Sequence, residues 1–584
     1  MKKIGIGYEF YKEFVEDDLY YVDKTLLIRD IVEKGGKVTL FTRPRRFGKT
    51  LALTMLQAFF EDERDRYGKS IDNSHFFYGM KVQSCGEDIL SRQGKYPVIF
   101  LTLKSARQPG FHAAFMKIRD EIVNEFIRHD YVLDSELVNE NDKEIFRSIL
   151  NSRKEWDEKQ KKSSTPEEKE EAFMAEVAQF STALRKLSEC LKQYHGKNAV
   201  ILLDEYDVPL ENAYFSGFYQ DMVGFIRSLF ESSLKTNSAL EFAVITGCLR
   251  ISRDSIFTGL NHLEICSIRN GDFGEYFGFT PDETMQMLTD YGITEKKDEV
   301  RHWYDGYLFG QTEVYNPWSV TKYVKAHVTD IDSFPEAYWS NTSSNAIIKD
   351  LVEKASEEQK RELDILINGG TIEKQVHEDI TYDDIHESEE NLWNFLFFTG
   401  YMKKVSERFE DRKIYVTMKI PNEEIAYIYS QQIRGWFDRI VMGADKGELH
   451  RAILERDTES AEKYLCALLG KTISYFDFEE SFYHGFLLSL LYGVPGYETY
   501  SNREAGNGRP DIVLYPLNPK DPVIIFELKI RKAFNRMDDG LQEAYKQIRD
   551  QRYAEGITDE GYAGCVAYGV CFCKKSCIIG KYTE

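Results

Sequence analysis

The sequence of 584 residues lacks long apolar segments and is short of positive charge. No apolar run approaches the roughly 20 residues that a membrane-spanning helix needs, and the opening MKKIGIGYEF lacks the apolar core of a signal peptide. We therefore expect a cytoplasmic protein with no membrane partner. Lys and Arg total 75 against 97 Asp and Glu, which gives a net charge of −22. This balance argues against a protein that coats nucleic acid and confines any such contact to local basic patches.

Cysteine is also sparse. The nine cysteines form no disulfide-like framework, which fits a reducing compartment. Four of them cluster near the C-terminus, at Cys565, Cys571, Cys573 and Cys577. A zinc site would need a paired CxxC spacing that this cluster lacks, so buried free thiols are the better interpretation. No Ser-His-Asp elbow and no glycine-rich dinucleotide fingerprint stands out.

A phosphate-binding loop is the most informative stretch that is present, FTRPRRFGKT at residues 41–50. Residues 37–42 form an apolar run of strand length that leads into this loop. Residues 51–61 form an apolar run of helical period that follows Gly48, Lys49 and Thr50. Strand, loop and helix are the context in which backbone N–H groups cradle phosphates. Lys49 would then reach the β- and γ-phosphate oxygens, and the Thr50 hydroxyl would bind Mg²⁺. The loop begins with Arg43, where the standard pattern has glycine.

Two acids end a second buried strand. Residues 198–204, NAVILLD, form a continuous apolar run that is typical of a parallel strand, and it closes with Asp204 and Glu205. Ligands of open α/β sheets bind at the carboxyl ends of the strands. We therefore expect Asp204 to hold Mg²⁺ and Glu205 to activate the attacking water. The alternative is a strand that ends in a solvated turn.

A third strand, residues 241–247, places polar groups at the same edge. It ends near Thr246, which would sense the γ-phosphate. Arg250 and Arg253 follow at once, and either could stabilise charge on the transferring phosphoryl group, within one chain or across a homo-oligomer. Pairing of these arginines with the many acids of the chain is an equal alternative.

Taken together, these segments resemble a known family. YVDKT, FTRPRRFGKTLALTML, ILLDEYDVPL and ITGCLRISRDSIFTGLNHL resemble the N-terminal part of the AAA-ATPase-like family of bacterial and archaeal proteins, whose loop likewise reads RPRRFGKT. The resemblance covers about the first half of the chain and implies an ATPase core of the regulatory kind, with Arg43 as part of a working loop. The nucleotide-binding residues that we expect are Arg43, Pro44, Arg45, Arg46, Phe47, Gly48, Lys49, Thr50, Leu51, Asp204, Thr246 and Arg250.

The middle of the chain carries no chemistry that we can assign. Aromatic-rich stretches, HWYDGYLFG and VYNPWSV, predict a packed connector after the ATPase core. Residues 321–440 read mostly as amphipathic helices, followed by a strand at 413–420. Helices followed by a short strand suggest a winged-helix-like module. We do not assign sequence-specific DNA binding to it, because this segment lacks a basic recognition face.

Two strands joined by a turn carry a second constellation. Asp511 opens the first strand, and VIIFELK at 523–529 forms the next. The period of two places Glu527 and Lys529 on one face. Asp511 and Glu527 could together hold one or two ions of Mg²⁺ or Mn²⁺, while Lys529 would orient or activate the attacking water. The alternative is an ordinary strand pair with solvated charges at its ends.

This arrangement is the pattern of the PD-(D/E)XK nuclease superfamily, and the segment resembles the nuclease domain that accompanies the AAA-ATPase-like family. The resemblance implies that the helix at 478–491 supplies a further acid, for which Glu480 is our choice, with His484 one turn later. It also implies that Gln547, on the helix after Lys529, orients the water or contacts phosphate.

The charge around this second constellation turns positive. The basic residues are Lys529, Arg531, Lys532, Arg536, Lys546, Arg549 and Arg552. A basic patch beside an acidic metal site suits a phosphate backbone, so we expect nucleic acid, DNA in the first place, as partner. A solvated helix face is the alternative, because Asp538, Asp539, Glu543 and Asp550 are interleaved.

The sequence thus predicts an α/β protein in three parts. We expect a P-loop ATPase domain with a parallel sheet over 1–300, a helical, winged-helix-like module over 301–440, and a restriction-endonuclease-like PD-(D/E)XK domain over 441–584. ATP binding or hydrolysis would control a metal-dependent nuclease. The alternative is an ATP-dependent switch whose nuclease-like domain binds nucleic acid or a partner without cleavage.

Overall fold

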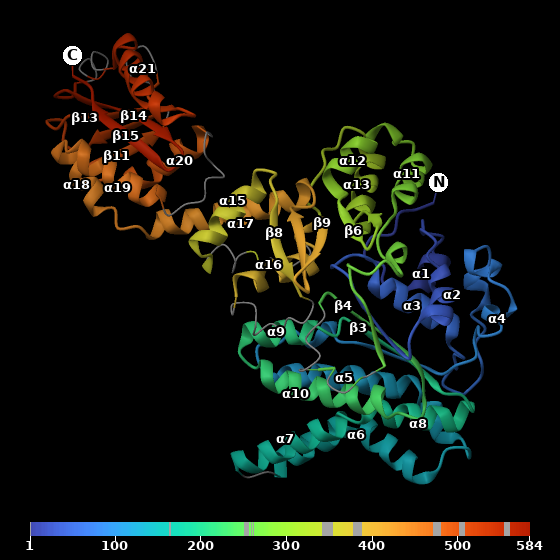
Figure 1. The fold of residues 1–584 in the computed structure, drawn as a ribbon. Coiled ribbons are helices and arrows are strands. Elements are labelled where there is room, and N and C mark those ends of the chain that lie inside the picture. The colour runs from blue at the N-terminus through green and yellow to red at the C-terminus, as the bar shows by residue number, and fades with distance from the viewer. Residues whose placement is uncertain are drawn as a thin grey trace. The chain divides into compact units, whose positions relative to one another are not determined.

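The chain divides into two compact units in a computed structural model (Figure 1). The first unit comprises Met1–Ser344 and Thr371–Ala426, and the second comprises Asn345–Gly370 and Tyr427–Glu584. The structure describes residues 2–162, 165–249, 256–257, 260, 262–340, 348, 354–377, 388–470, 480–501, 509–553, 557 and 561–583. One helix, α17 (Glu423–Gly443), runs from the first unit into the second.

A five-stranded sheet of parallel strand pairs forms the core of the first unit. Its strands follow the order β2-β3-β4-β1-β5. Their bounds are β1 Val38–Thr42, β2 Val98–Thr102, β3 Ala199–Asp204, β4 Leu240–Gly247 and β5 Leu263–Cys266. β1 and β3 are buried along their whole length, as their unbroken apolar runs predict. The expected α/β class with a parallel core sheet is therefore confirmed.

Helices cover this sheet. α3 (Lys49–Phe60) packs against β2, β3 and β4, while α5 (Phe111–Arg128) packs against β2 and α8 (Ala183–His195) against β3 (Figure 1). The other helices of this part are α1 Tyr11–Glu16, α2 Leu26–Lys34, α4 Glu87–Leu90, α6 Glu140–Lys162, α7 Pro166–Phe180, α9 Val208–Ser216 and α10 Tyr219–Phe230.

A separate apolar cluster follows the core sheet. It is built from α11 (Pro281–Asp290), α12 (Lys297–Tyr304) and α13 (Pro317–Thr329), with a short hairpin of β6 (Tyr307–Phe309) and β7 (Thr312–Val314). Tyr304 and Tyr315, which belong to the two aromatic stretches of the sequence, are buried in it together with Tyr323 of α13.

The remaining part of the first unit contains more strand than the sequence suggested. Three strands within residues 371–426 form an antiparallel sheet of order β8-β10-β9. Along the chain, α16 (Glu389–Phe398) lies between β8 and β9. Of the strands β8 (Ile372–Val376), β9 (Lys403–Glu410) and β10 (Lys413–Lys419), we expected only β10. The expectation of helices was wrong for the other two. Most of β9 is exposed, so its sequence, KKVSERFE, lacks the apolar alternation that marks a half-buried strand.

The second unit is a mixed five-stranded sheet covered by helices on both faces. Its order is β11-β12-β13-β14-β15, parallel between β13 and β14 and antiparallel elsewhere. The strand bounds are β11 Tyr497–Ser501, β12 Ile512–Pro516, β13 Val523–Ile530, β14 Cys565–Cys573 and β15 Ser576–Lys581. The helices around the sheet are α18 Gly447–Glu455, α19 Thr458–Gly470, α20 Glu480–Leu491 and α21 Met537–Asp550. α15 (Glu357–Ile367) also belongs to this unit.

The alternation of side chains along β12 separates the two apolar layers. Ile512 and Leu514 pack with α18, α19 and α20, whereas Val513 and Tyr515 pack with the end of α21. A strand buried on both faces needs apolar residues at every position. The result confirms the mixed α/β architecture expected for the C-terminal part.

Three glycines let α21 approach the sheet closely. A Cβ atom on Gly540 would lie 2.4 Å from the Cys571 Sγ atom, and one on Gly569 would lie 3.0 Å from Leu541. Gly580 makes the same kind of room for Tyr545. Because α21 carries Gln547 and leads to Tyr553, this packing places both side chains.

We predict that Gly540→Ala lowers the free energy of unfolding of the second unit by about 1–3 kcal/mol, because the added methyl overpacks the helix–sheet contact. Gly485→Ala is the matched control: Gly485 also lies in a helix, α20, but open space surrounds its Cβ position. That change should be neutral or stabilising by up to about 1 kcal/mol through helix propensity. Urea unfolding followed by circular dichroism measures both. Equal effects of the two changes would contradict close packing at Gly540.

Candidate active sites

The phosphate loop connects β1 to α3, as its sequence predicts. Gly48 has a φ of +79°, a left-handed conformation that glycine adopts without strain, and Lys49 begins the helix directly after it. The free N–H groups of the first helical turn therefore face the end of the sheet. This arrangement provides the backbone donors and the helix N-terminus that bind phosphate in such loops.

Lys49 is held inside the loop by backbone oxygens. Its Nζ donates to the carbonyl oxygens of Arg43 and Pro44, each at 2.9 Å, and lies 3.6 Å from the Cys248 sulfur. The side chain is buried. A phosphate that entered the loop would replace neutral carbonyl partners of Lys49 with charged ones, which make stronger hydrogen bonds.

Asp204, at the end of β3, is hydrogen-bonded to β4 and to the first turn of α3. Thr50 Oγ1 donates to its Oδ2 at 2.7 Å, and Thr246 Oγ1 donates to its Oδ1 at 2.6 Å. Burial raises the pKa of Asp204, and the negative charge of Glu205 raises it further. Asp204, Thr50 and Thr246 are thus brought together as expected. Glu205 follows β3 with a φ of +51° and remains partly exposed.

The other loop residues pack against protein. The Arg43 side chain is fully buried over the rings of Phe277 and Phe309, with its guanidinium carbon 5.3 and 4.9 Å from their centroids, and it donates to the Cys266 carbonyl at 2.7 Å. Its contact with a nucleotide would therefore come from its backbone. This environment also explains why an arginine stands where the standard loop has glycine: it fastens the loop to β5 and the segment after it.

Arg45, Arg46 and Phe47 also have partners within the first unit. Arg45 pairs with Glu211, Arg46 lies 4.5 Å from the Trp318 ring, and Phe47 packs on Tyr307 and Phe309. Pro44 lies against Gly400, whose φ of +91° and close approach leave no room for a Cβ atom. Leu51 lies in the first turn of α3 and is partly buried.

Two residues to which the sequence analysis gave no role hold the backbone after β4. Tyr206 Oη donates to the Leu249 carbonyl at 2.6 Å, and Asp207 Oδ2 accepts from the N–H groups of Cys248 and Leu249 at 2.7 and 3.1 Å. Burial raises the pKa of Asp207 to about 6. A signal was present, since Asp207 lies three residues beyond Asp204 in the same DEYD stretch. Arg250 and Arg253, which come next, lie outside the described residues.

In the second unit, strand register brings the carboxylates together. Ile512 pairs with Phe526 in the antiparallel β12–β13 ladder, so one further step sets Asp511 opposite Glu527. The Leu528 N–H donates to Asp511 Oδ2 at 2.7 Å, which fixes the first carboxylate. His484 on α20 lies 2.9 Å from the Asp511 carbonyl oxygen through its Nε2 and anchors the backbone there.

Glu527 is buried with one cation beside it. Its Oε1 accepts from Lys529 Nζ at 3.0 Å, and Tyr553 Oη lies 3.4 Å from its Oε2. Burial raises the pKa of Glu527 to about 7, and the nearby charge of Asp511 adds to the rise. Burial raises the pKa of Tyr553, while Gln547, which lies near it, lowers that pKa. The side chains of Lys529 and Tyr553 therefore meet at Glu527, with Asp511 opposite on β12 and Gln547 near Tyr553. The sequence did not reveal a role for Tyr553.

The donor set at this site fits a divalent cation. Asp511 and Glu527 stand opposite each other on neighbouring strands, and burial together with the charge of Asp511 raises the pKa of Glu527. A divalent cation would stabilise the charged form of such a carboxylate. Within the described ranges, no group of three His, Cys, Asp or Glu side chains is arranged to hold a metal. Glu480 begins α20, and its side chain lies outside the described atoms. Two carboxylates with water and substrate oxygens would suffice for Mg²⁺ or Mn²⁺.

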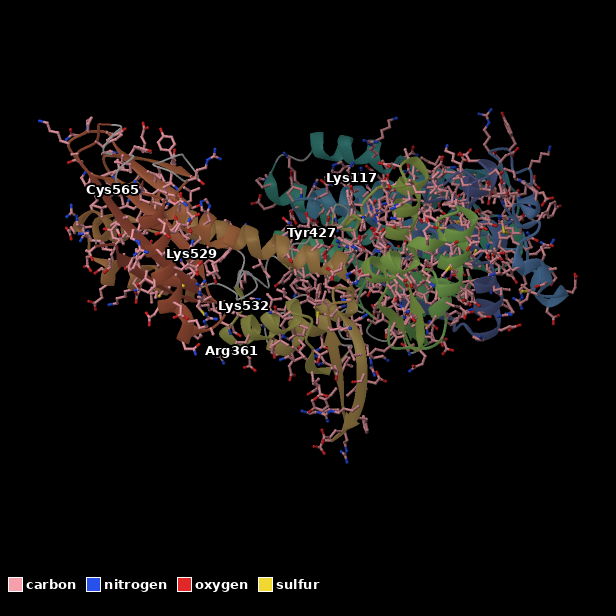
Figure 2. All side chains as sticks on the ribbon, turned by 90° about the horizontal axis from the view of Figure 1, so that it is seen from above. Lys117, Arg361, Tyr427, Lys529, Lys532 and Cys565 are labelled. Carbon is pink, nitrogen blue, oxygen red and sulfur yellow. The ribbon has the colours of Figure 1, made fainter. Side chains whose placement is uncertain are left out.

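The basic residues around the site are partly neutralised. Arg531 pairs with Glu543, Arg536 with Asp539, and Arg549 with Asp550. Lys532 is exposed and lies with Lys529 at one end of the sheet, while Cys565 lies at the other end of the same strand pair (Figure 2). In the described part of the chain, no helix is long and apolar enough to cross a membrane.

We predict that Glu527→Gln stabilises the metal-free protein above pH 7. The folded-state pKa of about 7 exceeds the ordinary value of 4.5, so the folded state holds this proton more tightly than the unfolded state. The stability that Glu527 contributes is full below about pH 4.5 and is lost as the pH rises through 7, by roughly 1–3 kcal/mol. The glutamine variant should lack this loss. Thermal unfolding in EDTA between pH 5.5 and 8 measures the difference, and parallel curves for the two proteins would contradict it.

Known proteins match both parts of the chain. A family model described as predicted AAA-ATPase matches residues 5–257, and a model described as PD-(D/E)XK nuclease superfamily matches residues 478–582. A curated relative, an uncharacterised protein in the vnfD 5′ region of Azotobacter chroococcum mcd 1, is 24% identical over 356 residues. That match covers 60% of this chain and 56% of the relative's length. The chain is therefore similar to the predicted AAA-ATPase family over residues 5–257 and to the PD-(D/E)XK nuclease superfamily over residues 478–582.

Proposed function

We propose that the protein binds and hydrolyses ATP at the loop of the first unit. The hydrogen bonds from Thr50 and Thr246 to Asp204 support this proposal, because they gather a loop hydroxyl, a strand acid and a sensor hydroxyl at one sheet edge. Lys49 would bind the β- and γ-phosphates, and Glu205 would orient the attacking water. Mg²⁺, held by Thr50 and Asp204, would neutralise phosphate charge when bound.

We propose further that the second unit cleaves nucleic acid, DNA in the first place. The observation that carries this proposal is the placement of Glu527, buried and facing Asp511 across two strands with Lys529 at 3.0 Å. Asp511 and Glu527 would hold Mg²⁺ or Mn²⁺, which supplies Lewis acidity at the phosphodiester. Lys529 would orient the attacking water and offset the charge that develops on the phosphate.

Other residues would position these groups. Gln547 would contact water or phosphate from α21, where it lies near Tyr553. Glu480 would complete the acidic set from the start of α20. Residues 301–440 would couple an ATPase domain over 1–300 to a nuclease domain over 441–584, in a protein that acts in the cytoplasm as a monomer or homo-oligomer.

The nucleotide proposal predicts that Lys49→Ala weakens ATP binding by roughly tenfold or more, because charged hydrogen bonds to the phosphates are lost. Glu205→Gln should keep ATP binding but lower hydrolysis by roughly 100-fold, as expected for loss of a general base. Lys95→Ala removes an exposed lysine that precedes β2 and is the control. Fluorescent-nucleotide titration and phosphate release measure the two effects. Wild-type binding by the Lys49→Ala protein would overturn the proposal.

The nuclease proposal predicts metal-dependent cleavage of DNA that falls roughly 100-fold or more in Lys529→Ala and in Asp511→Asn. Lys520→Ala is the control, since Lys520 is exposed in the turn at the other end of the β12–β13 hairpin. Circular DNA, linear DNA and single-stranded RNA are incubated with Mg²⁺ or Mn²⁺, with and without ATP. Cleavage that survives in Lys529→Ala would contradict the assigned site. Binding without cleavage by the wild-type protein would favour an ATP-dependent switch.

A further inference from the structure

Two cysteines that lie far apart in the sequence meet in the second unit. Cys466 lies on α19 and Cys577 on the edge strand β15, 111 residues later, yet their sulfur atoms are 3.7 Å apart. All nine cysteines are free thiols. Neither partner of this pair has a part in the proposed nuclease chemistry.

Contacts on both sides of the pair hold the sulfurs in place. The Cys577 N–H donates to the Cys466 sulfur at 3.2 Å. Glu462 lies one turn before Cys466 on α19, and its Oε2 accepts from the Ile579 N–H of β15 at 3.2 Å. α19 therefore lies fixed along β15. From this separation, rotation of the two side chains can bring the sulfurs to the roughly 2 Å of a disulfide bond.

The two thiols differ in reactivity. Cys466 is partly exposed, and the hydrogen bond from the Cys577 thiol, together with the Cys577 N–H, lowers the pKa of Cys466 to about 6. Cys577 is buried, and its pKa is raised by the hydrogen bond to Cys466. By contrast, burial raises the pKa of Cys565 to about 12. The thiolate is the reactive form of cysteine, so Cys466 is suited to attack and Cys577 to resolve.

We propose that Cys466 and Cys577 form a reversible disulfide when the protein meets a peroxide. The Cys466 thiolate attacks one peroxide oxygen, the O–O bond breaks, and the hydroxide that leaves is protonated to water. Cys466 is then a sulfenic acid. The Cys577 sulfur attacks the sulfur of that acid, its thiol proton is released, and the departing hydroxide takes up a proton as water. In total two thiols lose two electrons and two protons, and hydrogen peroxide is reduced to two waters.

The disulfide would make the second unit more stable. It ties α19 to the edge strand β15 and closes a long loop, which stabilises a fold chiefly by restricting its unfolded chain. Oxidation therefore raises the melting temperature of this unit by several degrees, and a dithiol reductant reverses the shift. The inference stands independently of the ATPase and nuclease proposals, since it rests on the thiol pair alone.

The test is oxidation of the reduced full-length protein with a small excess of hydrogen peroxide, followed by alkylation under denaturing conditions and peptide mapping. We expect a linked peptide that joins Cys466 to Cys577 and a loss of two free thiols. The melting temperature should rise and return after reduction. If both cysteines remain fully alkylated, or if they link to other cysteines instead, the proposal is overturned.

Three variants separate the two roles. Cys577→Ser should leave Cys466 as a sulfenic acid that dimedone traps, and Cys466→Ser should give neither the trap product nor the melting shift. Cys565→Ser, a partly exposed cysteine of the same sheet, should behave as the wild type. Should Cys466→Ser fail to fold, Cys466→Ala takes its place. Equal dimedone labelling in the Cys577→Ser and Cys466→Ser proteins would contradict the assignment of Cys466 as the attacking thiol.

Discussion

The burial of Glu527 opposite Asp511 is the constraint on which the second unit depends. A buried carboxylate facing another is unfavourable without added positive charge, and one lysine supplies only part of it. Much of the surrounding fold serves to hold this unfavourable pair: the β12–β13 register, the Leu528 N–H on Asp511, and the close packing of α21 over Gly540 and Gly569. Proteins retain such unfavourable arrangements at functional sites, where a bound ligand stabilises them.

The first unit also contains a buried carboxylate, that of Asp204, which threonine hydroxyls stabilise. Asp204 also ends a buried strand, but Thr50 and Thr246 donate to it, so both of its oxygens are satisfied within the protein. Lys49 is likewise held by carbonyls of its own loop. Each of these contacts joins groups that we propose bind nucleotide and metal, and each is made with weaker partners than a phosphate or a cation. The loop is thus kept in shape by the residues that its ligands would engage.

The sequence predicted the buried strands and the residues at their ends, because unbroken apolar runs and the phosphate loop are local patterns. It also predicted that Asp511, Glu527 and Lys529 share one sheet edge, since a turn between two antiparallel strands sets the start of the first beside the end of the second. It could not reveal the surroundings of Arg43, the role of Asp207 or the meeting of Cys466 with Cys577, because these depend on contacts between distant segments. The exposed strand β9 was missed for the opposite reason: it packs too little to leave an apolar pattern.

Titration of the full-length protein with Mn²⁺, in the absence of nucleotide, tests the central claim most directly. We expect the wild-type and Lys520→Ala proteins to bind one or two Mn²⁺ ions at neutral pH. Calorimetry or electron paramagnetic resonance measures this binding. Asp511→Asn and Glu527→Gln should lose this binding, while Thr50→Ala should keep it, because its hydroxyl belongs to the other site. Unchanged Mn²⁺ binding in both carboxylate variants, or no binding by the wild type, would contradict a metal-dependent nuclease at Asp511 and Glu527.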